Sequence, residues 1–279
     1  MFYWFFEAQT EPALKPLVIW LHGGPGCSSV AFGAAQEIGP FLVRRLSYFT
    51  NRLTFNEYSW NKVANVLFPE SPVSIGFSYT NNTNHLPEIG DQVVANDTVA
   101  CLLGWFKRFP DFKSHDFYII GESYGGHYAP QLADLIYKQT KELPNTRLSI
   151  SKDSCYVRKY FNQKEVQRAL HANVTNLPYP YTLCNSPNGL TLRRLCCPPF
   201  QSFEMQECAS GPIGLTVMEE WRPWFYKRQV AGWVDTYGKG LTLATIRGGG
   251  HEAALSARDW SLSLFTNFLS NSSLPSSSF

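Results

Sequence analysis

The fold of this chain is decided by Asp116-Phe117-Tyr118-Ile119-Ile120-Gly121-Glu122-Ser123-Tyr124-Gly125. An apolar run ends in a Gly-x-Ser-x-Gly turn, and a helical pattern follows from His127 to Tyr137. Strand, tight turn and helix are the setting in which this pattern forms a nucleophile elbow, with the serine hydroxyl projecting beyond the strand end. Ser123 is therefore the candidate nucleophile, although the same pattern also occurs in ordinary glycine-containing turns.

A second glycine-rich turn lies upstream. There the apolar run Pro16-Leu17-Val18-Ile19-Trp20-Leu21 ends in His22-Gly23-Gly24-Pro25-Gly26-Cys27-Ser28-Ser29. A His-Gly-Gly turn after a hydrolase strand presents backbone N–H groups to a developing oxyanion. Such a turn could by itself be a plain loop. The two motifs occur together, however, each at the end of a predicted strand. Together they supply a nucleophile and one wall of its oxyanion hole.

Further motifs carry a family resemblance. They are Glu70-Ser71-Pro72 with Gly76-Phe77-Ser78-Tyr79, Trp105-Phe106-Lys107-Arg108-Phe109-Pro110, and Gly249-Gly250-His251-Glu252. Together with the two turns they resemble the serine carboxypeptidases of the α/β-hydrolase superfamily, particularly the plant ones. The likeness covers roughly residues 2–149, 155–186 and 217–275. It implies an α/β class of structure, the α/β-hydrolase fold with a mostly parallel central sheet.

The resemblance also implies catalytic roles. Ser123 would be the nucleophile and His251 its base, in the serine-before-histidine order of α/β-hydrolases. The backbone N–H groups of Gly24 and Tyr124 would form the oxyanion hole. A lone histidine is more often structural, but His251 follows a predicted strand and a glycine turn that match the family's histidine turn.

A pair of carboxyl groups indicates the substrate class. By resemblance, Glu37 and Glu122 would hydrogen-bond the C-terminal carboxylate of a peptide. Two close carboxyl groups cannot both remain charged cheaply, so one retains a proton at mildly acidic pH and can donate to the substrate anion. The family has an asparagine beside this pair where this chain has His22, which could also donate to a carboxylate.

The triad acid is missing from the sequence. A triad needs an acid to fix the imidazole tautomer, and in the family this is an aspartate in a Ser-Gly-Asp turn after an apolar strand. No acidic residue between Ser123 and His251 follows such a strand. Asp235 falls in a predicted surface hairpin, and the segment from Leu195 to Leu215 resembles nothing in the family. After Ile150 a core strand and most of the helical lid are also missing, so the fold is expected to be incomplete.

Along the chain, residues 1–149 alternate strands and helices as the first half of the α/β domain, residues 150–215 are a remnant of the lid with an atypical segment, and residues 216–279 end the domain. The expected elements are strands at Phe2–Glu7, Leu17–Leu21, Val63–Phe68, Phe117–Ile120 and Leu241–Arg247, helices at Gln92–Phe109, Tyr128–Thr140, Asn162–His171 and Ala253–Leu269, and a disordered tail at Ser272–Phe279.

Composition limits the function further. A chain of 279 residues with 44% hydrophobic residues can bury the core of one domain. A net charge of +2 without a basic run argues against nucleic acid as a partner. No apolar stretch is long enough to span a bilayer, so no membrane partner is expected. Cys196-Cys197 lacks the spacing of a metal site, and neither a metal nor another cofactor is expected.

Seven cysteines and the sequons at Asn81, Asn96, Asn173 and Asn271 suggest an oxidising, glycosylating route. By resemblance, Cys27 would form a disulfide with Cys184. The N-terminal residues do not read as a signal peptide, whereas the resemblance implies a secreted or vacuolar (lysosomal) protein.

Three functions remain open. The first is a carboxypeptidase that takes peptides with a free C-terminus, with a homodimer possible by family analogy. The second is an acyltransferase, since plant relatives use the same triad to move acyl groups from sugar esters. Those relatives typically carry aspartate where this chain has Glu122, which favours the peptidase. The third is a non-catalytic fragment or binding module, for which the missing acid is direct evidence.

Overall fold

A computed structural model of the chain describes residues 1–45, 51–81, 90–139, 146–150, 216–238 and 241–277. By internal contacts the chain divides into two compact units. The first comprises Met1–Lys152 and Glu252–Ser272, and the second comprises Asp153–His251 and Ser273–Phe279. The division of the chain into residues 1–149, 150–215 and 216–279, which was made from the sequence, remains a proposal.

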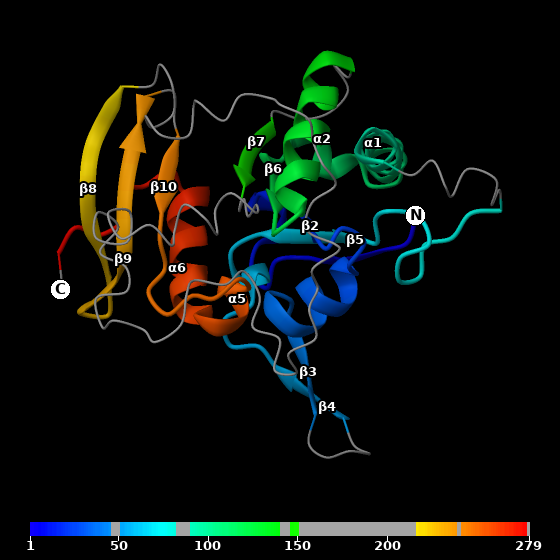
Figure 1. Ribbon diagram of the computed structural model, residues 1–279. Helices are drawn as coiled ribbons and strands as arrows, with labels where there is room; N and C mark the ends of the chain where they lie inside the picture. Colours follow the sequence, from blue (N-terminus) through cyan, green and yellow to red (C-terminus); the bar gives the residue numbers. More distant parts are fainter. Residues whose placement is uncertain (46–50, 82–89, 140–145, 151–215, 239–240, 278–279) are drawn as a thin grey trace, which may run out of the picture. The chain divides into compact units, whose positions relative to one another are not determined.

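The first unit contains a central sheet with helices on both faces (Figure 1). Its strands are β1 (Tyr3–Phe6), β2 (Leu17–Leu21), β3 (Phe41–Arg45), β4 (Asn51–Phe55), β5 (Asn65–Pro69), β6 (Phe117–Gly121) and β7 (Thr146–Ile150). Its helices are η1 (Pro12–Leu14), η2 (Ser29–Glu37), η3 (Trp60–Lys62), α1 (Asp91–Arg108), η5 (Pro110–Ser114), α2 (Gly125–Gln139), α5 (Ala253–Ser256) and α6 (Arg258–Leu269).

The central sheet has the order β1-β5-β2-β6-β7, in which only β1 pairs antiparallel. Every residue of β2, β5 and β6 is buried, as expected for parallel strands covered on both faces. The mostly parallel α/β sheet expected from the sequence is thus confirmed. The sequence placed β1, β2, β5 and β6 within two residues of their observed bounds.

Alternate side chains of these strands divide into two cores. Ile19 and Ile119 belong to the core under α1 and α2. Trp20 and Ile120 belong to the opposite core, which also receives Phe265 of α6. The carboxyl ends of β2 and β6 lie side by side, with Leu21 opposite Gly121. This pairing brings the two glycine turns of the sequence to one edge of the sheet.

The second unit contains a three-stranded antiparallel sheet of order β10-β9-β8. Its strands are β8 (Val217–Tyr226), β9 (Gln229–Tyr237) and β10 (Thr242–Ala244). Asp235 lies in β9 opposite Leu243 of β10, within the hairpin expected from the sequence. The strand expected from Leu241 to Arg247 is shorter than predicted.

Two C-terminal expectations are corrected. The helix expected over Ala253–Leu269 is divided into α5 and α6 at Ala257. The break lets the Arg258 guanidinium donate to the carbonyls of Leu255 and Gln36 at 3.2 and 2.8 Å, which satisfies an open carbonyl at the end of α5.

The tail expected to be disordered instead packs on β8 over residues 273–277. Phe225 N donates to Pro275 O at 3.0 Å, and the Leu274 side chain is buried. The helix expected over Asn162–His171, the atypical segment and the site of the missing strand and lid lie outside the described residues.

Candidate active site

The turn between β6 and α2 has the geometry of a nucleophile elbow. Ser123 has a φ of 57°, a left-handed conformation that is strained for a residue with a side chain. A Cβ atom at Gly121 would overlap Gly125 O, and one at Gly125 would overlap Leu21 O. The Gly-x-Ser-x-Gly pattern is therefore required by close backbone approach. It leaves Ser123 half-buried at the carboxyl end of the sheet.

The turn after β2 lies directly against this elbow. A Cβ atom at Gly23 would overlap Tyr124 N, and would come within 2.8 Å of the Ser123 Cβ. Gly24 has a φ of 111°, and Cys27 N closes the turn on Gly23 O at 2.9 Å. The structure thus brings together the two segments that carry the candidate oxyanion donors, the N–H groups of Gly24 and Tyr124.

Three buried ionisable side chains meet beside these turns. His22 Nδ1 lies 3.4 Å from Glu122 Oε2 and 3.8 Å from Glu37 Oε1, and all three residues are at most 5% exposed. Phe32 stacks on the imidazole with centroids 5.1 Å apart. The sequence predicted this grouping of His22, Glu37 and Glu122 from motif positions far apart in the chain.

Burial constrains the charges of this group. Two buried carboxylates without compensation are costly, so a proton on His22 or on one of the carboxyls stabilises the cluster. Trp20 Nε1 can donate to His22 Nδ1 at 3.5 Å, and this requires Nδ1 to be unprotonated. The same nitrogen can therefore face the indole when neutral or the carboxylates when protonated.

Glu70 supports the turn after β2, a role that the sequence did not indicate. Ser28 Oγ donates to Glu70 Oε1 at 2.7 Å and accepts from Ala31 N at 2.8 Å, which caps η2. Burial raises the pKa of Glu70 above its usual value, while the hydrogen bonds from Ser28 and from the Ser29 backbone oppose that rise. The motif Glu70-Ser71-Pro72 marked the resemblance, but nothing in it indicated this contact.

Asp91 was also missed. Its carboxylate, in the first turn of α1, accepts from Tyr124 OH at 3.1 and 3.2 Å and from Gln131 Nε2 at 3.3 Å. Burial and the nearby Asp91 raise the pKa of Tyr124. The residue after the candidate nucleophile is therefore tied to α1 through its side chain.

The chain is similar to known proteins. A family model described as serine carboxypeptidase matches residues 1–151 and 196–271. Serine carboxypeptidase-like 35 of Arabidopsis thaliana is 35% identical, with 100% of the chain and 86% of the relative covered. The corresponding values for serine carboxypeptidase-like 34 of the same plant are 33%, 100% and 84%. The chain belongs to the serine carboxypeptidase family.

A crystal structure is also similar. It is that of Kex1(delta)p, a prohormone-processing carboxypeptidase from Saccharomyces cerevisiae, at 28% identity. The match covers 60% of this chain and 37% of that one, with a TM-score of 0.47.

Family membership confirms the α/β-hydrolase fold class and the hydrolase ancestry. It also corrects two expectations about the middle of the chain. The family model matches residues 196–271, and so includes nearly all of the segment from Leu195 to Leu215 that was expected to be unlike the family. The same model leaves residues 152–195 unmatched, although a likeness was expected over 155–186. The alignment with the first plant relative spans 418 positions against 279 residues here. That relative therefore has additional residues within the aligned span.

The candidate base follows β10. His251 is half-buried after a turn in which Gly248 has a φ of 72°. It belongs to the second compact unit, whereas Ser123 belongs to the first. The pairing of a serine carboxypeptidase nucleophile with this histidine thus remains a prediction of the sequence.

The remaining candidate sites are the four sequons and the expected Cys27–Cys184 disulfide. Asn81, Asn96 and Asn271 are exposed, while Asn173 and Cys184 lie outside the described residues. Within Asn96-Asp97-Thr98, the threonine is buried and its hydroxyl donates to Val94 O at 2.7 Å. Burial, then Glu122 and Glu252, raise the pKa of the Cys27 thiol.

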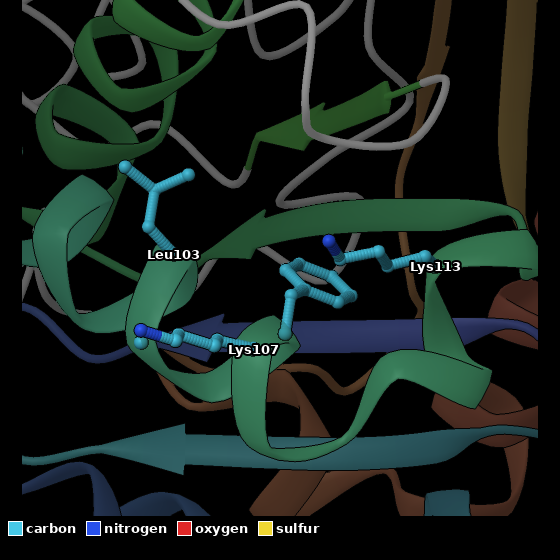
Figure 2. A pocket seen from close by; sticks show the side chains of 5 residues that line it. Leu103, Lys107 and Lys113 are labelled. Carbon is cyan, nitrogen blue, oxygen red and sulfur yellow. The ribbon is translucent and has the colours of Figure 1, made fainter.

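A cavity of about 300 Å³ lies elsewhere, on α1 and η5 (Figure 2). Its lining residues, which include Lys107 and Lys113, share no member with the candidate site. Across the described part of the chain, no group of three or more His, Cys, Asp or Glu side chains has an arrangement that could hold a metal ion. Among the same residues, no helix is long and apolar enough to cross a bilayer.

Proposed function

We propose that this chain is a serine-type carboxypeptidase that releases C-terminal amino acids from peptides at acidic pH. The observation that carries the proposal is the strained Ser123 turn packed against Gly23 beside the buried group of His22, Glu37 and Glu122. A nucleophile beside two acidic side chains that can share a proton suits an acyl transfer from a substrate with a terminal carboxylate.

In this proposal Ser123 attacks the scissile carbonyl and forms an acyl-enzyme, which water then hydrolyses. His251 accepts the serine proton and returns it to the leaving amine. The N–H groups of Gly24 and Tyr124 stabilise the oxyanion. One carboxyl of Glu37 and Glu122 keeps its proton and donates to the substrate carboxylate, while His22 adds a second donor when it is protonated. No metal or other cofactor takes part.

The chain is impaired in this mechanism. Without the family's aspartate, the imidazole of His251 loses the partner that sets its tautomer. Asp235 lies within β9 and is a poor replacement. Membership of the serine carboxypeptidase family and a preserved nucleophile turn are therefore compatible with a chain of low peptidase activity. They are also compatible with a fragment that binds peptides without hydrolysing them.

Further properties belong to the same proposal. Passage through the secretory route would place the protein outside the cell or in the vacuole, with glycans at exposed sequons and a Cys27–Cys184 disulfide. A homodimer is possible by family analogy.

The test compares substrates. Peptides with free C-termini should be hydrolysed in preference to the same peptides as amides, with the preference fading above neutral pH as the shared proton is lost. Equal turnover of amides would remove the role of Glu37 and Glu122. Preferential turnover of glucose esters would instead support an acyltransferase.

A further inference from the structure

His22 adds a third titratable group to the two carboxyl groups that would hold a substrate carboxylate. Its Nδ1 atom lies 3.4 Å from Glu122 Oε2 and 3.8 Å from Glu37 Oε1, and none of the three residues is more than 5% exposed. The family has an asparagine at this position, and an asparagine side chain does not titrate. The cluster of His22, Glu37 and Glu122 can therefore hold one more proton than two glutamates with an amide.

The imidazole is held toward these carboxyl groups by its surroundings. Phe32 of η2 stacks on the ring, with centroids 5.1 Å apart and planes inclined by 4°. The backbone is fixed as well, because His22 N donates to Ser29 Oγ at 3.3 Å. Trp20 Nε1 lies 3.5 Å from Nδ1 and donates to it when that nitrogen carries no proton. A proton on Nδ1 is therefore shared with buried carboxyl groups rather than with bulk water.

The net charge of the cluster depends on how many protons it holds. With two protons it consists of an imidazolium, one neutral carboxyl group and one carboxylate, and it is neutral overall. Loss of one proton leaves a net negative charge, and loss of both leaves two carboxylates beside a neutral imidazole. A substrate carboxylate is attracted to the states that keep a charged or acidic donor, and it is repelled by the state with two uncompensated carboxylates.

The imidazole is the strongest base of the cluster. The ordinary pKa of histidine is roughly 6.5 and that of glutamate roughly 4.3. The two carboxylates next to Nδ1 favour the imidazolium further, and this attraction offsets the cost of burying separated charges. Cys27, in the adjacent turn, adds no charge, because burial, then Glu122 and Glu252, raise the pKa of its thiol. Glu252 is itself acidic, so its charge has the sign that favours the imidazolium.

We propose that His22 sets the upper pH limit for binding the terminal carboxylate of a peptide, and that this limit lies at higher pH than an asparagine would allow. The inference rests on the proposed function, because it assumes that Glu37 and Glu122 hold that carboxylate. After the glutamates have lost their shared proton, the imidazolium still compensates one carboxylate. The preference for free-acid peptides over amides is then lost only when His22 becomes neutral, which makes His22 a specificity-determining residue.

Equilibrium binding tests the proposal. The full chain carries Ser123→Ala as the parent, so that turnover does not consume the ligand. The probes are benzyloxycarbonyl-Phe-Leu with a free carboxyl group and the same compound as its amide. Isothermal titration calorimetry gives the ratio of the two affinities between about pH 4 and about pH 8, a range that spans the ordinary pKa values of glutamate and histidine.

The parent should keep its preference for the free acid to a pH about one unit higher than the variant His22→Asn does. At the pH where the variant has lost the preference, the affinity ratio of the parent should therefore be ~10-fold higher. His22→Gln should behave like His22→Asn, because neither amide titrates. The matched control is His115→Asn, which replaces a half-buried histidine before β6 whose Nδ1 lies 2.6 Å from Lys15 O. It should keep the profile of the parent.

Two further measurements keep the test independent of the variants' stability. Thermal unfolding confirms that each variant is folded. NMR of the parent with labelled histidine should show one imidazole that titrates with the midpoint of the affinity ratio, and the absence of such an imidazole would overturn the inference.

The inference and the proposed function fail in different ways. Equal binding of acid and amide at every pH, or binding of neither, would remove the proposed function and this inference with it. A preference in acid that fades at the same pH in the parent and in both His22 variants would overturn the inference alone. A limit that moves to higher pH in the variants would also overturn it, because the proton would then reside on the glutamates.

Discussion

The turn that carries the candidate nucleophile and the turn that carries the candidate base use glycine for different reasons. At Gly121 and Gly125 a Cβ atom would collide with backbone atoms. At Gly248 a Cβ atom would meet nothing within 4 Å, but the φ of 72° favours glycine. The nucleophile turn requires glycine because β2, β6 and α2 pack closely there, whereas at Gly248 it is the positive φ that favours glycine. The two turns should therefore respond differently to substitution.

The largest effect is expected at the nucleophile. If the chain folds, a fluorophosphonate probe should label it, and Ser123→Ala should reduce labelling to background because the attacking hydroxyl is removed. Ser256→Ala, in α5, is the control and should label like the wild type. Labelling that survives Ser123→Ala would show that the elbow is not the reactive site.

The second effect concerns the histidine side. Removing the orienting acid lowers turnover by roughly 10⁴-fold in serine proteases, so the chain should be close to inactive. Replacing about residues 190–215 by the family's strand with its Ser-Gly-Asp turn, and restoring the segment after Ile150, should recover activity by orders of magnitude. Asp235→Asn should leave turnover of the unmodified chain unchanged. Full activity without restoration, lost in Asp235→Asn, would identify Asp235 as the acid.

The contrast between the two turns also explains what the sequence could predict. Apolar runs followed by Gly-x-Ser-x-Gly and Gly-Gly-Pro-Gly identify β2 and β6 because backbone collisions leave no alternative to glycine there. The resemblance carried by these motifs also predicted that His22, Glu37 and Glu122 lie together. His22 and Glu122 directly follow β2 and β6, and Glu37 is the last residue of η2.

Other features were not predictable from local patterns. Ser28 with Glu70, and Tyr124 with Asp91, are pairs separated by 42 and 33 residues, and no periodicity indicates such side-chain contacts. The β3–β4 ribbon was missed because its strands, Phe41–Arg45 and Asn51–Phe55, contain arginines and lack the continuous apolar run of the predicted strands. The helix break at Ala257 is accompanied by the tertiary contact of Arg258 with Gln36, which the helical pattern does not indicate.

A pair of glycine substitutions tests the comparison directly. Gly125→Ala places a Cβ against Leu21 O and should reduce the free energy of unfolding by more than about 3 kcal/mol. Gly248→Ala meets only the strain of a positive φ and should cost about 1 kcal/mol. Urea unfolding measures both values. Equal costs would show that the two turns are fixed by the same means.

The pH dependence of stability should depend on Glu70. Burial raises its pKa above the usual value of a glutamate, so the folded protein binds this proton more tightly than the unfolded chain. The Glu70 contribution to the free energy of unfolding is therefore greatest in acid and is lost as the pH rises through the folded-state pKa. Glu70→Gln should flatten this dependence, measured as the melting temperature against pH. Glu7→Gln, at an exposed position, is the control, and an unchanged profile in Glu70→Gln would refute the assignment.

The smallest effect is expected at the hydrogen bond from Tyr124 to Asp91, which supports the nucleophile turn. Tyr124→Phe removes the hydroxyl that donates to Asp91, but Gln131 Nε2 still donates to that carboxylate at 3.3 Å. Because Asp91 keeps a partner, the loss should be close to that of one net hydrogen bond, about 1 kcal/mol in the free energy of unfolding. The rate of fluorophosphonate labelling should fall less than ~10-fold, since the backbone N–H of residue 124 is retained. Tyr137→Phe provides the exposed control. A loss of labelling as complete as that of Ser123→Ala would mean that the phenol itself takes part in the chemistry, and the nucleophile turn would then depend on side chains as well as on backbone packing.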